Sequence, residues 1–282
     1  WNDDPMTAMR LATDVGVVLA AELRASAVDL SFTPVLDLDY GDSRVIRDRS
    51  FHRDPKAVTL LARALVQGLA QRGMSNCGKH FPGHGFVQAD SHIDIPVDDR
   101  ALDAVLDEDA MPYAWLGDSV LQAVMPAHVI YPKVDAHPAG FSRVWVQDIL
   151  RGRLGYEGVV FSDDLTMEGA TVAGDILGRA TAALGAGCDM VLVCNRPDLA
   201  DDLLARLEAG EGSPADAAAG TGAAAEHARI RSQPGRMSAE SAARVARLMP
   251  RFDAPDWDGL VTDSVYTRAR DRILALPRYN PA

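Results

Sequence analysis

Short apolar runs alternate with longer amphipathic segments along most of the chain. The runs are four to eight residues long, and most are nearly continuous in apolar side chains. Such runs are typical of strands that are buried on both faces of a parallel sheet. The predicted strands are 31–38, 76–81, 122–126, 159–162 and 190–193.

Helices are predicted between these strands from apolar residues that recur at helical spacing. The first two begin at Asp4-Pro5 and Asp54-Pro55, where Asp can cap the helix and Pro fits its first turn. Gly73 is expected to end the second helix. The predicted helices are 5–27, 55–71, 101–116, 145–154, 176–184, 197–208, 223–231, 239–248 and 266–276.

The order of these elements predicts an α/β fold. Every predicted strand leads into polar or ionisable residues, which favours a (β/α)8 TIM-type barrel over a doubly wound sheet. A full barrel needs eight strands and five are recognised, so we expect the first βα units to lie upstream of Trp1. We expect residues 1–282 to form a single domain, with 223–282 as a C-terminal helical segment packed on it.

The composition narrows the range of partners and compartments. The 282 residues carry a formal net charge of −12, which argues against nucleic acid or an anionic membrane as a partner. No apolar run approaches the roughly 20 residues of a membrane helix. The cysteines lack metal-binding spacing and are interpreted as reduced thiols, so we expect a cytoplasmic protein. We also expect the protein to be a monomer. The cysteines are Cys77, Cys188 and Cys194.

The densest group of titratable residues follows the strand 76–81. Two glycines and a proline break the chain into a loop there. Polar side chains at a strand exit, followed by a loop, indicate the rim of an active site in an α/β protein. The alternative is a polar turn whose histidines are solvated or cap nearby backbone. The group consists of Lys79, His80, His84, Asp90 and His92.

Other strand exits add candidate groups, each with a structural alternative. Asp163 could be a catalytic carboxylate or a helix cap, although its neighbour Asp164 fits the structural role better. Lys79 could bind a ligand or form an ion pair with Asp37, and Arg49 could bind a ligand or pin its own loop. Two further histidines are interpreted as structural or supporting residues: His84 and His128.

Several short motifs follow one another along the chain. They are Lys79-His80-Phe81-Pro82-Gly83-His84-Gly85 with Asp90-Ser91-His92, then Met125-Pro126-Ala127-His128, then Phe161-Ser162-Asp163-Asp164-Leu165, with Pro34-Val35-Leu36-Asp37 and residues 46–49 before them and Gly187-Cys188-Asp189-Met190 after them. Together they closely resemble family 3 glycoside hydrolases, in particular the single-domain bacterial β-N-acetylhexosaminidases. The resemblance covers residues 22–195 and is specific, because separate motifs fall in the right order.

The resemblance implies a retaining glycosidase that removes terminal N-acetylglucosamine from peptidoglycan fragments (muropeptides) in cell-wall recycling. Asp163 would be the nucleophile, and His92, oriented by Asp90, would be the acid/base. An imidazole with an ordinary pKa of about 6.5 can give and take a proton near neutrality. No cofactor or metal is implied. The implied substrate-binding residues are Arg49, Lys79 and His80.

The chain departs from the family pattern in two places. Arg47 stands where a small residue is expected, and the early Asp-Gln-Glu-Gly-Gly segment, which supplies a carboxylate for sugar hydroxyls, is not found. Three alternatives therefore stay open. They are a metal-dependent hydrolase on the same fold, a family 3 β-glycosidase of other specificity, and an inactive sugar-binding fragment.

Overall fold

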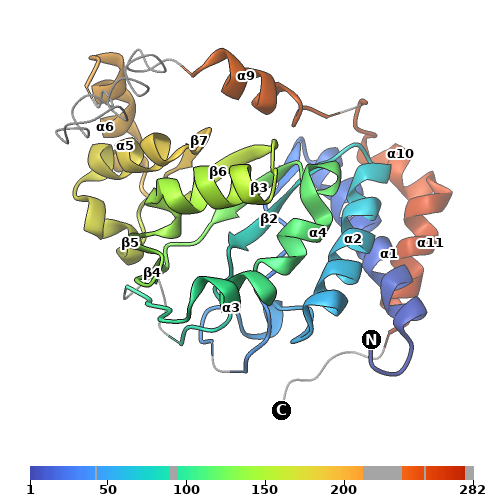
Figure 1. Cartoon of the computed structure of the whole chain (residues 1–282). Helices are drawn as coiled ribbons and strands as arrows, with labels where there is room; N and C mark the ends of the chain where they lie inside the picture. The colour runs from blue at the N-terminus through green and yellow to red at the C-terminus, as the bar shows by residue number, and fades with distance from the viewer. Residues whose placement is uncertain (42, 89–94, 212–236, 251, 277–282) are drawn as a thin grey trace.

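The central element is a five-stranded parallel sheet. The computed structural model describes residues 1–41, 43–88, 95–211, 237–250 and 252–276. The strands lie in the order β1-β2-β3-β6-β7 and form a curled sheet, so the predicted α/β class is confirmed (Figure 1). The described residues add no further strand to this sheet. The strands are β1 (Leu30–Ser31), β2 (Ser75–Phe81), β3 (Ala123–Pro126), β6 (Val159–Asp164) and β7 (Met190–Leu192).

The first strand is shorter than the predicted 31–38, because Pro34 has no N–H to donate to a ladder. The segment nevertheless continues along β2. The N–H of Lys79 donates to the Pro34 carbonyl at 3.1 Å, and the N–H of Leu36 donates to the Lys79 carbonyl at 2.6 Å. This pairing brings Asp37, at the end of the segment, beside His80.

A small antiparallel hairpin, which the sequence pattern did not predict, follows β3. It consists of β4 (Ile130–Tyr131) and β5 (Asp135–Pro138). Two to four paired residues are too few to show a period of two in the sequence. The hairpin lies near α3 at the edge of the sheet where the strands end (Figure 1).

Two long helices pack closely against each other beside the sheet. Helix α1 (Pro5–Ala25) and helix α2 (Pro55–Gln71) begin at the predicted Asp-Pro pairs, and Asp4 and Asp54 accept the expected capping hydrogen bonds. At their crossing, a Cβ on Gly68 would lie 2.1 Å from the Thr13 carbonyl oxygen. Only glycine permits this approach of two helix backbones.

The helices predicted between residues 101 and 208 are present with two differences, and a short helix at Trp257–Thr262 was not predicted. The predicted helix 101–116 is divided into α3 (Leu102–Asp107) and α4 (Met111–Val120), with Pro112 in the first turn of α4. The predicted helix 145–154 is a π-helix, η3 (Val144–Arg153). Helices α5 (Ile176–Ala186) and α6 (Pro197–Glu208) cover the β7 end of the sheet (Figure 1).

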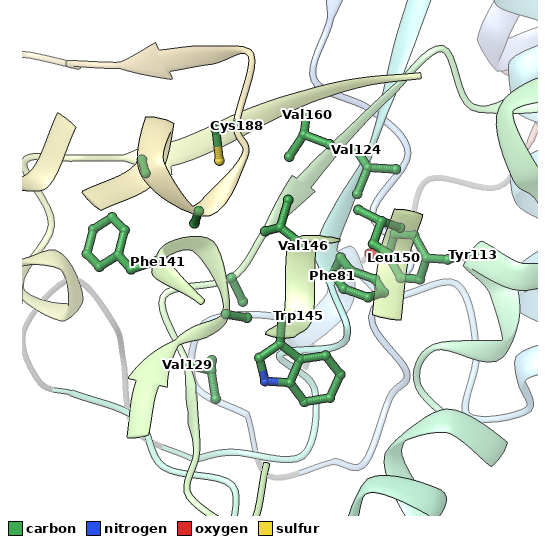
Figure 2. Close-up of a cluster of buried hydrophobic side chains, with 14 of the residues drawn as sticks. Phe81, Tyr113, Val124, Val129, Phe141, Trp145, Val146, Leu150, Val160 and Cys188 are labelled. Carbon is green, nitrogen blue, oxygen red and sulfur yellow. The ribbon is translucent and has the colours of Figure 1, made fainter. Parts of the chain in front are cut away.

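The sheet has apolar side chains on both faces, as expected of parallel strands. On one face, Val124 and Val160 pack with Tyr113 of α4 and with Val146 and Leu150 of η3 (Figure 2). The opposite face carries a separate cluster, which includes the following residues: Cys77, Ala123, Met125, Val159, Phe161 and Leu248. The ladder of β6 shifts its register between Phe161 and Asp164, and the charge of Asp163 acts on Cys77 of this cluster.

Three described helices at the C-terminal end pack on the sheet and on α1. They are α9 (Ala239–Ala246), α10 (Trp257–Thr262) and α11 (Ser264–Leu274). Arg272 of α11 binds Asp14 of α1 at 2.5 Å, and Tyr266 donates to Glu22 at 2.8 Å. The predicted helix 223–231 lies outside the described residues. Among the described helices, none combines the length and the apolar character needed to cross a membrane.

Candidate active site

Asp163 lies at the carboxyl end of β6 and is 9% exposed. Its Oδ1 accepts a hydrogen bond from the Asp164 N–H at 2.8 Å. Burial opposes ionisation, but the imidazoles of His80 and His128, the Asp164 N–H and the charge of Lys79 outweigh it and lower the pKa of Asp163. Helix η4 (Glu168–Ala173) begins after Met167, so Asp163 does not cap it. The structure therefore offers an ionised, rigidly held carboxylate at this strand end.

The neighbouring Asp164 has a structural position. Its carboxylate accepts hydrogen bonds from the Thr166 N–H at 2.9 Å, the Thr166 hydroxyl at 2.7 Å and the Cys194 N–H at 3.0 Å. It therefore ties the end of β6 to the segment that follows β7, which is the structural role expected for Asp164.

His80 forms a buried pair with Asp37. Its Nδ1 lies 2.7 Å from Asp37 Oδ2, and its backbone N–H donates to Asp37 Oδ1 at 3.2 Å. The N–H of His84 donates to the same Oδ1 at 2.7 Å. Burial opposes ionisation of Asp37, yet the contacts with His80 and His84 lower its pKa. Asp37 thus pairs with His80 rather than with Lys79.

Lys79 is half-buried in β2, on the same strand face as Cys77. It pairs in register with Met125 of β3. Its charge contributes to the lowered pKa of Asp163. The ammonium group therefore acts on the carboxylate that the sequence assigns as nucleophile.

Arg49 lies in the short helix η1 (Arg47–Arg49) and is exposed. Its Nε and Nη2 donate to the Val45 carbonyl at 3.2 and 2.8 Å. The guanidinium therefore pins its own loop, and a sugar contact from Arg49 stays a prediction. The adjacent Arg47 has a φ of +46°, a backbone conformation that side chains other than Asn, Asp and Gly rarely adopt.

The predicted acid/base pair, Asp90 and His92, lies outside the described residues. On either side of residues 89–94, Phe86 and Arg100 are stacked, with the guanidinium carbon 3.9 Å from the ring centroid. Arg100 also binds Asp98 at 2.6 Å and Asp109 at 2.8 Å. The chain on both sides of the predicted acid/base is therefore held by one cluster.

Two residues that the sequence did not assign to chemistry adjoin Asp163 and His80. One is Asp37, which the sequence offered only as part of a family motif and as a possible ion-pair partner of Lys79. The other is His128, whose Nε2 donates to the Asp164 carbonyl at 3.1 Å. Burial lowers the pKa of His128, so the ring is neutral, and its Nδ1 has no hydrogen-bond partner among the described residues. Both residues stand in the motifs that carry the family resemblance, but the sequence alone does not show what they contact.

The described residues contain no group of three or more His, Cys, Asp or Glu side chains arranged to hold a metal ion. The Asp37 carboxylate accepts hydrogen bonds from His80 and His84, and the Asp163 carboxylate accepts one from the Asp164 N–H. The chemistry that this site supports is attack by a buried carboxylate beside a Lys and a His.

Comparisons with known proteins identify the family of the chain. The model of the glycosyl hydrolase family 3 N-terminal domain matches residues 4–219. A β-hexosaminidase of Bordetella parapertussis is 66% identical over 270 residues, which cover 96% of this chain and 69% of the relative. A β-hexosaminidase of Aromatoleum aromaticum is 55% identical over 276 residues, or 98% of this chain and 70% of that relative.

A solved structure is also similar. NagZ from Neisseria gonorrhoeae, in complex with N-trifluoroacetyl-D-glucosamine, superposes with a TM-score of 0.77 and 43% identity. The match covers 95% of this chain and 69% of the NagZ chain. By family match, by identity and by fold, the chain belongs to glycosyl hydrolase family 3.

Proposed function

We propose that this chain is the catalytic domain of a retaining β-N-acetylglucosaminidase that acts on peptidoglycan fragments. The observation that carries the proposal is the buried, ionised Asp163 at a strand end beside Lys79 and His80. It is supported by 66% identity to a β-hexosaminidase and by a similar NagZ structure with an N-acylglucosamine ligand. The substrate would be a muropeptide with a terminal β-linked N-acetylglucosamine, in cytoplasmic cell-wall recycling.

The first step would be attack of Asp163 on the anomeric carbon, which breaks the glycosidic bond and forms a covalent glycosyl-enzyme. His92 would protonate the leaving oxygen, with Asp90 holding the ring and stabilising the imidazolium. In the second step His92 would take a proton from water, and the hydroxide oxygen would replace Asp163 at the anomeric carbon.

Lys79, His80 and Arg49 would hold the sugar. Lys79 and His80 point from a buried strand end, where a sugar hydroxyl can satisfy their remaining polar atoms. Arg49 uses two of its five N–H donors on Val45, so donors of its planar fork are left for the substrate.

The eight-stranded (β/α)8 barrel expected from the sequence belongs to the same proposal. Its support is the curled parallel sheet and the similarity to NagZ. In such a barrel the face of Val159 and Phe161 would line the interior, with the catalytic groups at the carboxyl ends of the strands.

The proposal is tested by mass spectrometry after exposure to a fluorinated N-acetylglucosaminide that traps the glycosyl-enzyme. We expect one added sugar, on the peptide that carries Asp163, and none in Asp163→Asn. The matched control is Asp164→Asn, in which Asp163 should still be labelled. A label on another carboxylate would refute the role of Asp163, and the absence of any label would favour the inactive sugar-binding alternative.

A further inference from the structure

Asp37 is 1% exposed and lies at the end of the segment that runs along β2. Three N–H groups converge on its carboxylate. The backbone N–H groups of His80 and His84 both donate to Oδ1, at 3.2 and 2.7 Å. Oδ2 is thereby left for the Nδ1 atom of His80, at 2.7 Å. The two backbone contacts fix which oxygen meets the imidazole.

This arrangement determines which nitrogen of His80 carries a hydrogen. The lowered pKa of Asp37 means that its carboxylate is ionised, and an ionised carboxylate only accepts hydrogen bonds. Nδ1 of His80 must therefore be protonated. Nε2 takes no part in the contact with Asp37 and can bind a ligand. It would donate a hydrogen bond in the imidazolium and accept one in the neutral ring.

Two other ionisable groups near Asp37, His84 and Tyr113, are uncharged, so neither of them can be the ionised partner of His80. The His84 ring lies edge-on to the His80 ring, with centroids 6.0 Å apart. Burial and the charge of His80 lower the pKa of His84, so His84 stays neutral. Tyr113 of α4 stays protonated, because burial and the charge of Asp37 raise its pKa. Asp37 is thus the ionised partner that sets the His80 ring.

We propose that Asp37 is a positioning residue for the glycosidase reaction: it holds the Nδ1–H of His80 and so presents Nε2 to the sugar beside Asp163. The inference rests on the proposed function, because the benefit of a fixed His80 is a fixed sugar at the nucleophile. It parallels the general arrangement in which a buried carboxylate selects the tautomer of a working histidine.

The first experiment is NMR of the full chain with ¹⁵N-labelled histidine, in which His80→Asn identifies the His80 ring signals. We expect Nδ1 of His80 to be protonated in the wild type. In Asp37→Asn the amide oxygen can keep the two backbone N–H groups while the amide N–H faces Nδ1, so His80 should switch to the tautomer with hydrogen on Nε2. An unprotonated Nδ1 in the wild type would overturn the proposal without any variant.

The second experiment is a double-mutant cycle on kcat/KM with an aryl N-acetylglucosaminide. We expect Asp37→Asn to lower kcat/KM by about 100-fold or more in the wild type. In the His80→Asn background the same change should cost less than about threefold, because the residue through which Asp37 acts is absent. Equal losses in both backgrounds would overturn the proposal and assign Asp37 a purely structural role.

The matched control is Asp189→Asn, which alters another buried aspartate at the opposite ends of the strands. It should leave the His80 ring signals unchanged. The NMR result does not depend on turnover, so it separates the two proposals. A trapped sugar on a residue other than Asp163 would refute the proposed function. The NMR experiment would still show whether Asp37 sets the tautomer of His80.

Discussion

Two buried aspartates at opposite ends of the strands are neutralised in different ways. Asp37, at the carboxyl ends, meets one ionisable side chain, His80, and two backbone N–H groups. Asp189, just before β7, meets two guanidinium groups: Arg151 at 3.0 Å and Arg244 at 2.6 Å. It also accepts from the Val160 N–H at 2.9 Å.

The difference separates a working carboxylate from an anchoring one. Arginine is always charged, so the two partners of Asp189 keep their charge, and the cluster serves to join η3, the sheet and α9. Histidine can change its charge and keeps a second ring nitrogen for other partners. The carboxyl ends of the strands therefore have groups that can respond to a ligand, while the amino ends hold helices in place.

The largest expected effect is at the carboxyl ends. Asp163→Asn removes the nucleophile, so we expect kcat/KM for an aryl N-acetylglucosaminide to fall by on the order of 10⁴-fold or more. The melting temperature should change little, since the amide oxygen can still accept the Asp164 N–H. Asp164→Asn is the control, and it should reduce stability more than Asp163→Asn does. If Asp163→Asn kept the turnover of the wild type, Asp163 would not be the nucleophile.

The second-largest effect is expected at the amino ends of the strands. Asp189→Ala leaves Arg151 and Arg244 without their shared carboxylate, and removing one partner of a buried ion pair costs about 3–5 kcal/mol. We expect a loss of this size in the free energy of urea unfolding, and unchanged kcat/KM for the molecules that remain folded. An exposed pair, Arg196–Asp198, provides the control, because solvent screens it and Asp198→Ala should leave the free energy of unfolding nearly unchanged. A loss of turnover without a loss of stability in Asp189→Ala would contradict the comparison.

Local signals in the sequence predicted much of the fold. Asp-Pro pairs located the starts of α1 and α2, and the predicted helix 197–208 coincides with α6. The strands were found from their apolar runs. The predicted strand 31–38 was too long because Pro34 interrupts the ladder, although the segment still follows β2. A two-residue strand such as β4 carries no readable period.

The site was only partly predictable, because its geometry depends on contacts between distant segments. Lys79, His80 and Asp163 could be recognised at strand exits. The pair of Asp37 with His80 joins residues 43 apart in the sequence and depends on the alignment of Val35 with Lys79. The orienting role of a carboxylate comes from this register, which no local pattern encodes. The placement of Asp90 and His92 stays a prediction.

A third buried aspartate, Asp109, sharpens the comparison, because it has an arginine partner but incomplete contacts. Its Oδ2 accepts from Arg100 at 2.8 Å and Tyr40 at 2.9 Å, while its Oδ1 has no hydrogen-bond partner among the described residues. Burial raises the pKa of Asp109 to about 6, despite the charge of Arg100. A carboxylate with permanently charged partners is thus not always an anchor: it must also have both oxygens satisfied.

The smallest expected effect follows from that raised pKa. The folded chain holds the Asp109 proton more tightly than the unfolded chain, whose ordinary pKa is 3.8, so this group costs stability as the pH rises from about 4 to about 6. Asp109→Asn removes the titration, so urea unfolding should show the variant gaining on the wild type by on the order of 1–2 kcal/mol over this range. A stability difference that stays constant from pH 4 to pH 7 would show that Arg100 alone keeps Asp109 ionised, and Asp109 would then belong with Asp189 as an anchor.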